Sequence, residues 1–275
     1  MNEIKFQVIS DVHLEFYSTY PKIKPLTKYL FLAGDIGTIK DVKDMRIEKF
    51  LSYCSKNWEK TFYVLGNHEY YQEFGKKNIL TFEELEEKYK NICAKFDNIH
   101  LLSDSCIEID KGLNVYGTTL WTCNFGYPYD LSDVFNDYNN IFIKSSENSK
   151  QLLNKNYIDI KSKNQFNKLK NYLDNLNNSK TKSIILTHFP PIRKGSSNPK
   201  YSNQEEYISN YFSFENIYLK LNHSNIVCWI SGHTHYSYDI KQDKINFISN
   251  QMGYKIECLK HENNFEPDKI FELNY

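Results

Sequence analysis

Five short motifs, each placed directly after a stretch that predicts a buried strand, constrain the fold of this chain more than any other feature. In chain order the motifs are Asp11-Val12-His13, Gly34-Asp35, Gly66-Asn67-His68-Glu69, Thr187-His188 and Gly232-His233-Thr234-His235. They contain five of the eight histidines in the sequence. In an open α/β sheet the loops beyond the carboxyl ends of the strands meet in one crevice. We therefore expect these five segments, although far apart in sequence, to deliver their side chains to one place.

The first strand is predicted from the alternation of apolar and polar residues over Ile4–Ile9, and the other strands that precede motifs are predicted from apolar runs, because a strand buried on both faces has a continuous hydrophobic sequence. These strands are expected at about Ile4–Ile9, Tyr29–Ala33, Thr61–Leu65, Ser183–Thr187 and Ile226–Ser231. Apolar residues at helical spacing predict a helix over Asp41–Trp58, and the capping box that starts at Thr81 predicts a second helix to about Phe96. The order of strands and helices is typical of an α/β fold.

After about residue 98 the alternation of buried strands and helices gives way to short strands separated by turn residues. Short strands over Ile99–Leu102, Cys106–Ile109 and Asn114–Thr118 are expected to form an adjoining sheet, before a polar helical region from about Ser145 to Asn178. Further on, the pattern predicts a helix over Asn203–Leu221, a hairpin of Tyr236–Ile240 with Ile245–Ser249, and a strand over Tyr254–Leu259. The last three motif histidines must return to the same site, so residues 1–275 are predicted to form a single domain.

Composition limits the partners. Lys+Arg and Asp+Glu balance at 34 each, so no net field favours nucleic acid or an anionic membrane. No apolar run approaches the length of a membrane span. The six cysteines stand singly, without a C-x-x-C pair, and are interpreted as reduced, buried thiols, with Cys228 and Cys258 expected in strands. We expect a cytoplasmic protein that does not bind membranes.

The residue types in the motifs suit a metal centre. Aspartate, asparagine and histidine are hard and borderline ligands for divalent ions. Asp11 and His13 are two residues apart, so in extended backbone they would face the same side, and His233 and His235 repeat that spacing. Taken alone, the motifs at residues 11–13, 34–35 and 187–188 are better explained as turns or a core histidine, whereas for the rarer motifs at 66–69 and 232–235 the two explanations are evenly balanced. The joint order of all five favours a site that hydrolyses a phosphate ester.

The same motifs resemble those of the calcineurin-like metallophosphoesterases. The family pattern is D-x-H, G-D, G-N-H-[DE], H and G-H-x-H, and each element is present here. Segments 118–122 and 250–254 are also similar to a group of small bacterial-type phosphoesterases. The resemblance implies a four-layer α/β/β/α sandwich of two mixed sheets. It also implies two divalent ions, one held by Asp11, His13 and His235 and the other by Asn67, His188 and His233, with Asp35 bridging both.

Within that resemblance, His68 is expected to be the catalytic acid, or a cation that stabilises the transition state, because it follows the ligand Asn67 and points elsewhere. The alternative is that His68 only orients a ligand. Glu69 is expected to play a structural or supporting role. Attack by a metal-bridging hydroxide, in line with the leaving group, is the expected reaction. The sequence does not choose among Mn, Fe, Zn and Ni, and it does not specify the oligomeric state.

The substrate class follows from departures from the family's protein phosphatases. Those enzymes carry D-x-H-G, G-D-x-V-D-R-G and additional arginines, which Leu14 and the segment 34–37 do not match. The chain has two arginines, Arg46 in a helical stretch away from the motifs and Arg193 after His188. Few fixed cations favour a singly charged phosphodiester over a monoester dianion, with Arg193 as a candidate for binding the phosphate of a small ester.

Alternatives stay open at this point. They are a phosphomonoesterase or protein phosphatase, a nuclease, which the lack of basic bias disfavours, and a metal-binding scaffold without catalysis. The acidic segment with Asp130, Asp133 and Asp137 has two interpretations, a contribution to specificity or a helix N-terminus, and the second is favoured.

Overall fold

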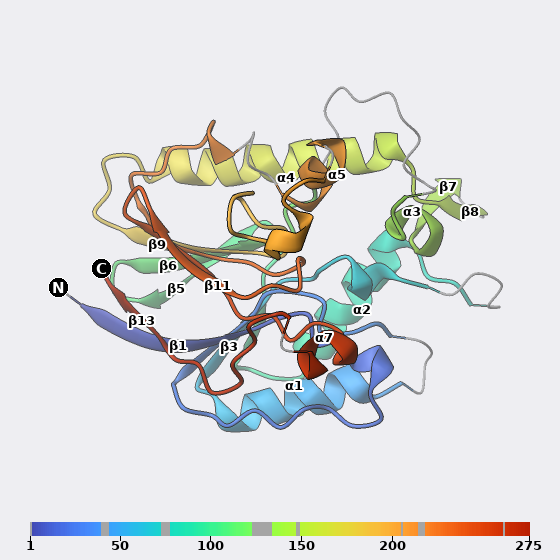
Figure 1. The fold of residues 1–275 in the computed structure, drawn as a ribbon, viewed down its shortest axis with the longest axis horizontal. Helices are drawn as coiled ribbons and strands as arrows, with labels where there is room; N and C mark the ends of the chain where they lie inside the picture. The colour runs from blue at the N-terminus through green and yellow to red at the C-terminus, as the bar shows by residue number, and fades with distance from the viewer. Residues whose placement is uncertain are drawn as a thin grey trace.

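The first of two large sheets holds the N-terminal strands. In the computed structural model, residues 2–39, 44–72, 78–122, 134–146, 149–204, 206–213, 218–260 and 262–275 are described. The strand order is β13 (Phe271–Asn274), β1 (Glu3–Ile9), β2 (Tyr29–Leu32), β3 (Lys60–Tyr63) and β4 (Ile99–Leu101). β1 to β4 run parallel, whereas the C-terminal strand β13 pairs antiparallel with β1. This makes the sheet mixed and places both chain ends together (Figure 1).

The second sheet is also mixed. Its strand order is β11 (Tyr238–Gln242), β12 (Ile245–Ser249), β10 (Ile226–Ile230), β9 (Lys182–Thr187), β6 (Leu113–Thr118) and β5 (Ser105–Asp110). The four central strands run parallel, and an antiparallel strand closes each edge. The prediction that the short strands after residue 98 begin an adjoining sheet is confirmed for β5 and β6, but β4 is the edge of the first sheet.

The two sheets face each other across an apolar layer. Phe6, Phe31 and Phe62 lie side by side on β1, β2 and β3, with ring centroids 5.0 Å apart in each neighbouring pair. They pack against side chains of the second sheet that include Ile184 and Ile230, and all five are buried. Because strands alternate their side chains, the opposite faces of both sheets need a cover of their own.

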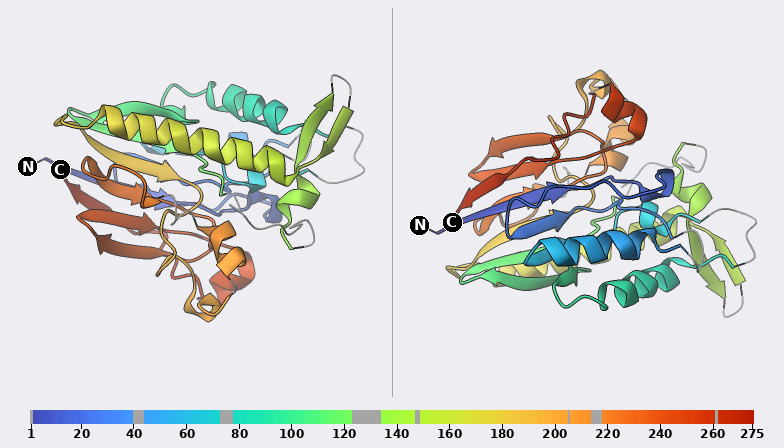
Figure 2. Two further views of the ribbon diagram at one scale, coloured as in Figure 1. Left: turned by 90° about the horizontal axis from the view of Figure 1, so that it is seen from above. Right: turned by 90° about the horizontal axis from the view of Figure 1, so that it is seen from below.

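Helices provide that cover. On the outer side of the first sheet, α1 (Arg46–Asn57) and α2 (Phe82–Cys93) bury apolar side chains, among them Phe50 and Leu85. On the outer side of the second sheet, α4 (Lys155–Asn175) contributes Leu169 and Leu173. Figures 1 and 2 show α4 on one side of the paired sheets and α1 on the other, so the four-layer α/β/β/α arrangement is confirmed.

A crossing segment ties the two sheets together beside the motifs. Asn250, just past β12, donates from Nδ2 to the carbonyl of Val8 on β1 at 2.9 Å. The next residue, Gln251, forms a parallel bridge with Ser10, directly before Asp11. Segment 250–254 therefore fixes the end of β1 against the second sheet.

Local signals explain which element predictions are right and which are wrong. The capping box at Thr81 is present, and α2 follows it. Tyr254–Leu259 was expected to be a strand, but α7 (Lys255–Leu259) is a helix, because Glu257 accepts the backbone N–H of Tyr254 at 2.7 Å and so caps its first turn. Cys258 is therefore in a helix and only half buried, and Cys106 is exposed, so the prediction of buried thiols holds for Cys54, Cys93 and Cys228. Cys123 lies outside the described residues.

Two helix predictions are too long. α4 begins at Lys155 after its N-cap Asn154, and the preceding residues form a small hairpin of β7 (Phe142–Ser146) and β8 (Ser149–Leu152). α5 covers Glu206–Phe212 and is followed by Ser213 outside the helix. The short helix α3 spans Asp137–Asn140. Among the described residues, no helix is both long and apolar enough to cross a bilayer.

Candidate metal centre

The five motifs converge at one edge of the paired sheets. Each follows the carboxyl end of a strand: β1, β2 and β3 in the first sheet, and β9 and β10 in the second. Backbone hydrogen bonds join neighbouring loops, from Asp11 N to Gly34 O at 3.0 Å and from Gly232 N to His188 O at 2.9 Å. The expected meeting of these segments is therefore present in the structure.

The backbone at the motifs is strained. Left-handed φ angles occur at Asp11 (54°), His13 (51°), Asp35 (51°), His233 (77°) and His235 (52°). For residues with a Cβ this conformation costs about 1–3 kcal/mol each, and such strain gathers at functional sites. The expectation that the two-residue spacings lie in extended backbone is wrong. Left-handed turns aim these side chains inward.

Two glycines make room for this convergence. A Cβ on Gly34 would lie 2.5 Å from His188 Nδ1, and one on Gly66 would overlap Asp35 Oδ1 and lie 2.7 Å from His188 Cε1. Their missing side chains make space for Asp35 and His188.

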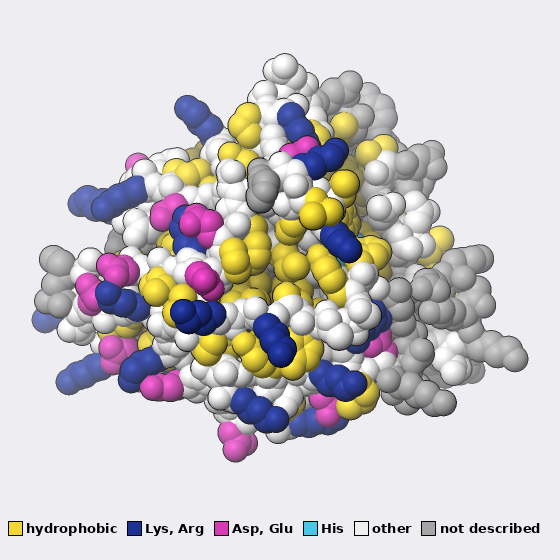
Figure 3. Space-filling model, turned by 60° about the horizontal axis from the view of Figure 1, so that its bottom comes forward, with side chains coloured by type: hydrophobic (Ala, Val, Ile, Leu, Met, Phe, Trp, Pro, Cys, Tyr) yellow, Lys and Arg dark blue, Asp and Glu magenta, His cyan; other side chains and the backbone are white. Residues whose placement is uncertain are grey.

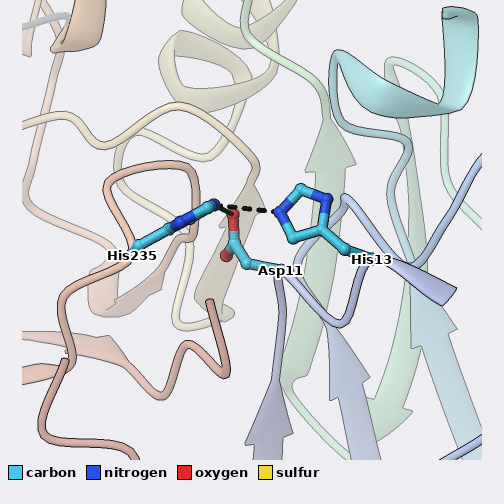
Figure 4. Close-up of side chains that lie close together, drawn as sticks. All are labelled: Asp11, His13 and His235. Carbon is cyan, nitrogen blue, oxygen red and sulfur yellow. Dashed lines mark hydrogen bonds and ion pairs between the residues drawn. The ribbon is translucent and has the colours of Figure 1, made fainter. Parts of the chain in front are cut away.

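The first donor group consists of Asp11, His13 and His235, all of which could contribute an atom to one ion. Figure 4 shows the two imidazoles and the carboxylate turned toward one another. His13 Nε2 lies 2.9 Å from His235 Nε2, and His235 Nε2 lies 3.6 Å from Asp11 Oδ1. Two ring nitrogens that face each other beside a carboxylate form a donor set suited to a cation.

The second donor group consists of Asp35, His188 and His233. His188 Nε2 lies 2.9 Å from Asn67 Oδ1 and 3.4 Å from Asp35 Oδ1, so the amide oxygen of Asn67 joins this group. His233 Nε2 is buried without a hydrogen-bond partner among the described residues. A buried polar atom without a partner is rare in proteins, and a metal ion would satisfy this nitrogen.

Asp35 lies between the two groups. Its Oδ1 faces His188, whereas its Oδ2 lies 4.0 Å from His13 Nε2 in the first group. Burial alone would raise the pKa of Asp35, but the neighbouring His188 and His68 hold this pKa well below its usual range. The carboxylate is therefore anionic, with one oxygen directed to each group.

Burial sets the protonation of the imidazoles. It lowers the pKa of His13 and, more strongly, that of His233, so both rings are neutral and carry a lone pair at physiological pH. His188 is also buried, but Asp35 more than offsets the burial and raises the pKa of His188 to about 9. A cation that binds His188 must therefore displace a proton.

Glu15 was not predicted from the sequence, but it forms hydrogen bonds with two of the predicted site residues. Its Oε1 lies 3.1 Å from His13 Nδ1 and 3.1 Å from His68 Nδ1. Burial opposes ionisation, but these two hydrogen bonds bring the pKa of Glu15 down to about 2. The charge on Glu15, together with Asp35, raises the pKa of His68 to about 9 despite its burial. His68 is therefore cationic. The only sequence signal for Glu15 is its position two residues after His13.

Two more carboxylates support the donor groups. Glu257 on α7 accepts a hydrogen bond from His235 Nδ1 at 2.7 Å. Asp137, at the start of α3, accepts from Asn67 Nδ2 at 2.8 Å, which turns the amide oxygen toward His188. Asp137 does lie at the start of a helix, which was the favoured interpretation, but it also orients Asn67 in the second donor group. Asp130 and Asp133 lie outside the described residues.

Glu69 has the supporting role expected for it. It is fully buried and accepts hydrogen bonds from the backbone N–H groups of Asp35, Ile36 and Gly66 and from the hydroxyl of Tyr63, at 2.7–3.0 Å. The loops after β2 and β3 are thereby fixed to one carboxylate.

A pocket of about 830 Å³ opens over the site. Arg193 and Lys194 line it together with His68 and His233. Arg46 does not line the pocket. It lies nearer to a motif than predicted, because its Nη1 donates to the carbonyl of Leu14, but its guanidinium is paired with Asp44.

Comparison with known proteins agrees with this geometry. The family model for calcineurin-like phosphoesterases matches residues 4–237. Uncharacterized protein L509 of Acanthamoeba polyphaga mimivirus is 32% identical over 281 residues, which cover 97% of this chain and 95% of that protein.

Solved structures share the fold. The phosphopantetheinyl hydrolase of Mycobacterium tuberculosis superposes with a TM-score of 0.69 at 16% identity, over 94% of this chain and 93% of that one. A dimetal phosphatase from Danio rerio has a TM-score of 0.53 at 12% identity, over 90% and 87% of the two chains.

The chain belongs to the calcineurin-like phosphoesterase family. Members of this family hydrolyse phosphate esters and typically bind two divalent metal ions, and both donor groups found here are candidates for such ions.

Proposed function

We propose that this protein is a dinuclear metal-dependent phosphodiesterase. The observation that carries the proposal is the position of Asp35, whose two oxygens face two separate donor groups. Asp11, His13 and His235 would hold one ion, Asn67, His188 and His233 would hold the other, and Asp35 would contact both. The unpartnered Nε2 of His233 and the facing ring nitrogens of His13 and His235 support the fit.

A pair of divalent ions bound there would lower the pKa of a water molecule and clamp the phosphate oxygens. The chain's own residues supply the remaining chemistry. His68 carries a proton, and Glu15 occupies its Nδ1, so Nε2 is the nitrogen that can donate to the leaving oxygen. The ring of Tyr71 stacks on His68 with centroids 4.1 Å apart and limits its rotation.

The substrate preference rests on the charges in the pocket. Besides the protonated His68, the positively charged side chains among its described lining residues are Arg193 and Lys194, both on one loop. A monoester dianion carries one more charge than a diester, and an additional cation would be needed to neutralise it. The pocket is also far larger than a phosphate, which leaves room for an organic group on each side of a diester.

A matched pair of substrates tests this preference. With Mn²⁺ present, we expect kcat/KM for a bis-aryl phosphodiester to exceed that for the corresponding aryl monoester. A phosphopantetheinyl ester belongs in the panel because of the name of the structural neighbour. Preference for the monoester, lost in Arg193→Ala, would contradict the diester assignment. Failure to hydrolyse any ester with metal bound would favour a non-catalytic scaffold.

A nuclease is the less favoured alternative. On the face of the molecule drawn in Figure 3, Lys and Arg side chains are dispersed among acidic ones around an apolar area. Among the described residues on this face, they are not gathered into a track for a nucleic acid backbone. Cleavage of an oligonucleotide at a rate above that of the small diester would reverse this ranking.

A further inference from the structure

The two donor groups have unequal electrostatic surroundings. In the first group each imidazole has a carboxylate on its far nitrogen: Glu15 lies 3.1 Å from His13 Nδ1, and Glu257 lies 2.7 Å from His235 Nδ1. The first group also contains its own carboxylate, Asp11.

The second group has mainly neutral surroundings. His188 Nδ1 lies 2.9 Å from the backbone carbonyl of Ala33. The ring of His233 packs against Phe189 and Phe212, with centroids 4.1 and 5.1 Å away. Asn67 is an uncharged amide, and its partner Asp137 is the one carboxylate among these contacts apart from the shared Asp35.

This difference has a direct consequence for metal affinity. A carboxylate on the far nitrogen of an imidazole fixes its tautomer and makes the near nitrogen a stronger donor, and loss of such a partner typically weakens metal binding by about 10–100-fold. Negative charge beside a buried site also attracts a cation more strongly than it would in water. In the first group both effects, the stronger nitrogen donor and the added negative charge, apply at His13 and at His235.

We propose that the two ion sites are unequal, with the Asp11–His13–His235 site binding the more tightly, and that Glu15 and Glu257 are the positioning residues that make it so. This inference rests on the proposed function, because it requires that both groups bind ions.

Glu257→Gln is the sharpest test, since Glu257 does not contact His68. The hydrogen bonds from His235 Nδ1 and from Tyr254 N both go to Oε2, so a glutamine oxygen can accept both and mainly the charge is lost. Binding of Mn²⁺ is measured by competition with a chromogenic chelator. We expect two affinity classes in the wild type, and a loss of about 10-fold or more in the tighter class of Glu257→Gln with the weaker class unchanged.

Asp137→Asn is the matched control, because Asp137 holds Asn67 in the second group. This variant is expected to weaken only the weaker class. Melting of the metal-free proteins checks folding, and Glu15→Gln repeats the test if Glu257→Gln is unstable. Equal affinities in the wild type, or an equal loss in both classes of Glu257→Gln, would overturn the inference. Binding of fewer than two ions by the wild type would instead refute the proposed function.

Discussion

Gly66→Ala tests whether the approach of two loops builds the metal centre. Gly66 follows β3, and its missing side chain leaves room for Asp35 and His188. A Cβ there would overlap Asp35 Oδ1 and lie 2.6 Å from Asp35 N and 2.7 Å from His188 Cε1. Non-bonded carbon contacts are favourable near 3.5 Å, so these atoms would have to move by roughly 1 Å.

The atoms that would have to move include those of Asp35, the residue proposed to bridge both ions. Misplacement of a reacting arrangement by about 1 Å can cost about 10²-fold in rate. We expect Gly66→Ala to lower kcat/KM by about 10²-fold or more and to reduce the occupancy of both ions. Metal content by elemental analysis and turnover of a chromogenic diester measure the two effects.

Gly112→Ala is the control, because it adds the same methyl group away from the site. Unlike Gly66, Gly112 has a positive φ (77°), and it lies in the turn before β6, at the opposite end of the strand from the site, where a Cβ would meet nothing within 4 Å. It should lose about 1–2 kcal/mol of stability from the left-handed backbone and keep full metal content. The reasoning fails if Gly66→Ala retains two ions and wild-type turnover.

Three further predictions address individual side chains. His68→Ala should reduce turnover by about 10²–10⁴-fold with both ions retained, and loss of the ions would make His68 a ligand or a structural residue. Asp35→Asn should weaken both ions whereas Asp11→Asn should mainly weaken one, so full occupancy in Asp35→Asn would defeat the bridging assignment. Because the pKa of His188 is about 9 in the metal-free protein, a proton competes with the ion below that pH. Affinity at the second site should therefore fall as pH is lowered through neutrality, by up to about tenfold per unit, and calorimetry showing no proton release on Mn²⁺ binding near pH 7 would contradict this.

The sequence identified the strands that position the site because buried strands produce apolar runs with clear ends. β1, β2, β3, β9 and β10 agree with their predicted spans to within two residues. Segments whose secondary structure depends on local side-chain contacts were harder to predict. The alternation of Tyr254, Ile256 and Cys258 resembles a strand, yet Glu257 caps a helix there. β13 was not predicted at all, since a short C-terminal strand is determined by the neighbour with which it pairs.

The meeting of the site residues could be predicted, because the sequence shows that each of them follows the end of a strand. Their backbone conformation could not. The left-handed φ angles of Asp11 and His13 depend on hydrogen bonds to the loop after β2, from Asp11 N to Gly34 O and from His13 N to Asp35 O. These contacts come from a distant part of the chain, and motif spacing alone contains no information about them.

The carboxylates that hold the site were missed for a related reason. With 34 acidic residues in the chain, composition cannot select Glu15 or Glu257. A general requirement could nevertheless have been stated: an imidazole that presents one nitrogen to a metal usually donates from the other. His13, His188 and His235 meet this requirement with Glu15, the carbonyl of Ala33 and Glu257. The sequence thus implies that such partners exist. Only the fold decides whether each partner is charged, and that difference distinguishes the two proposed ion sites.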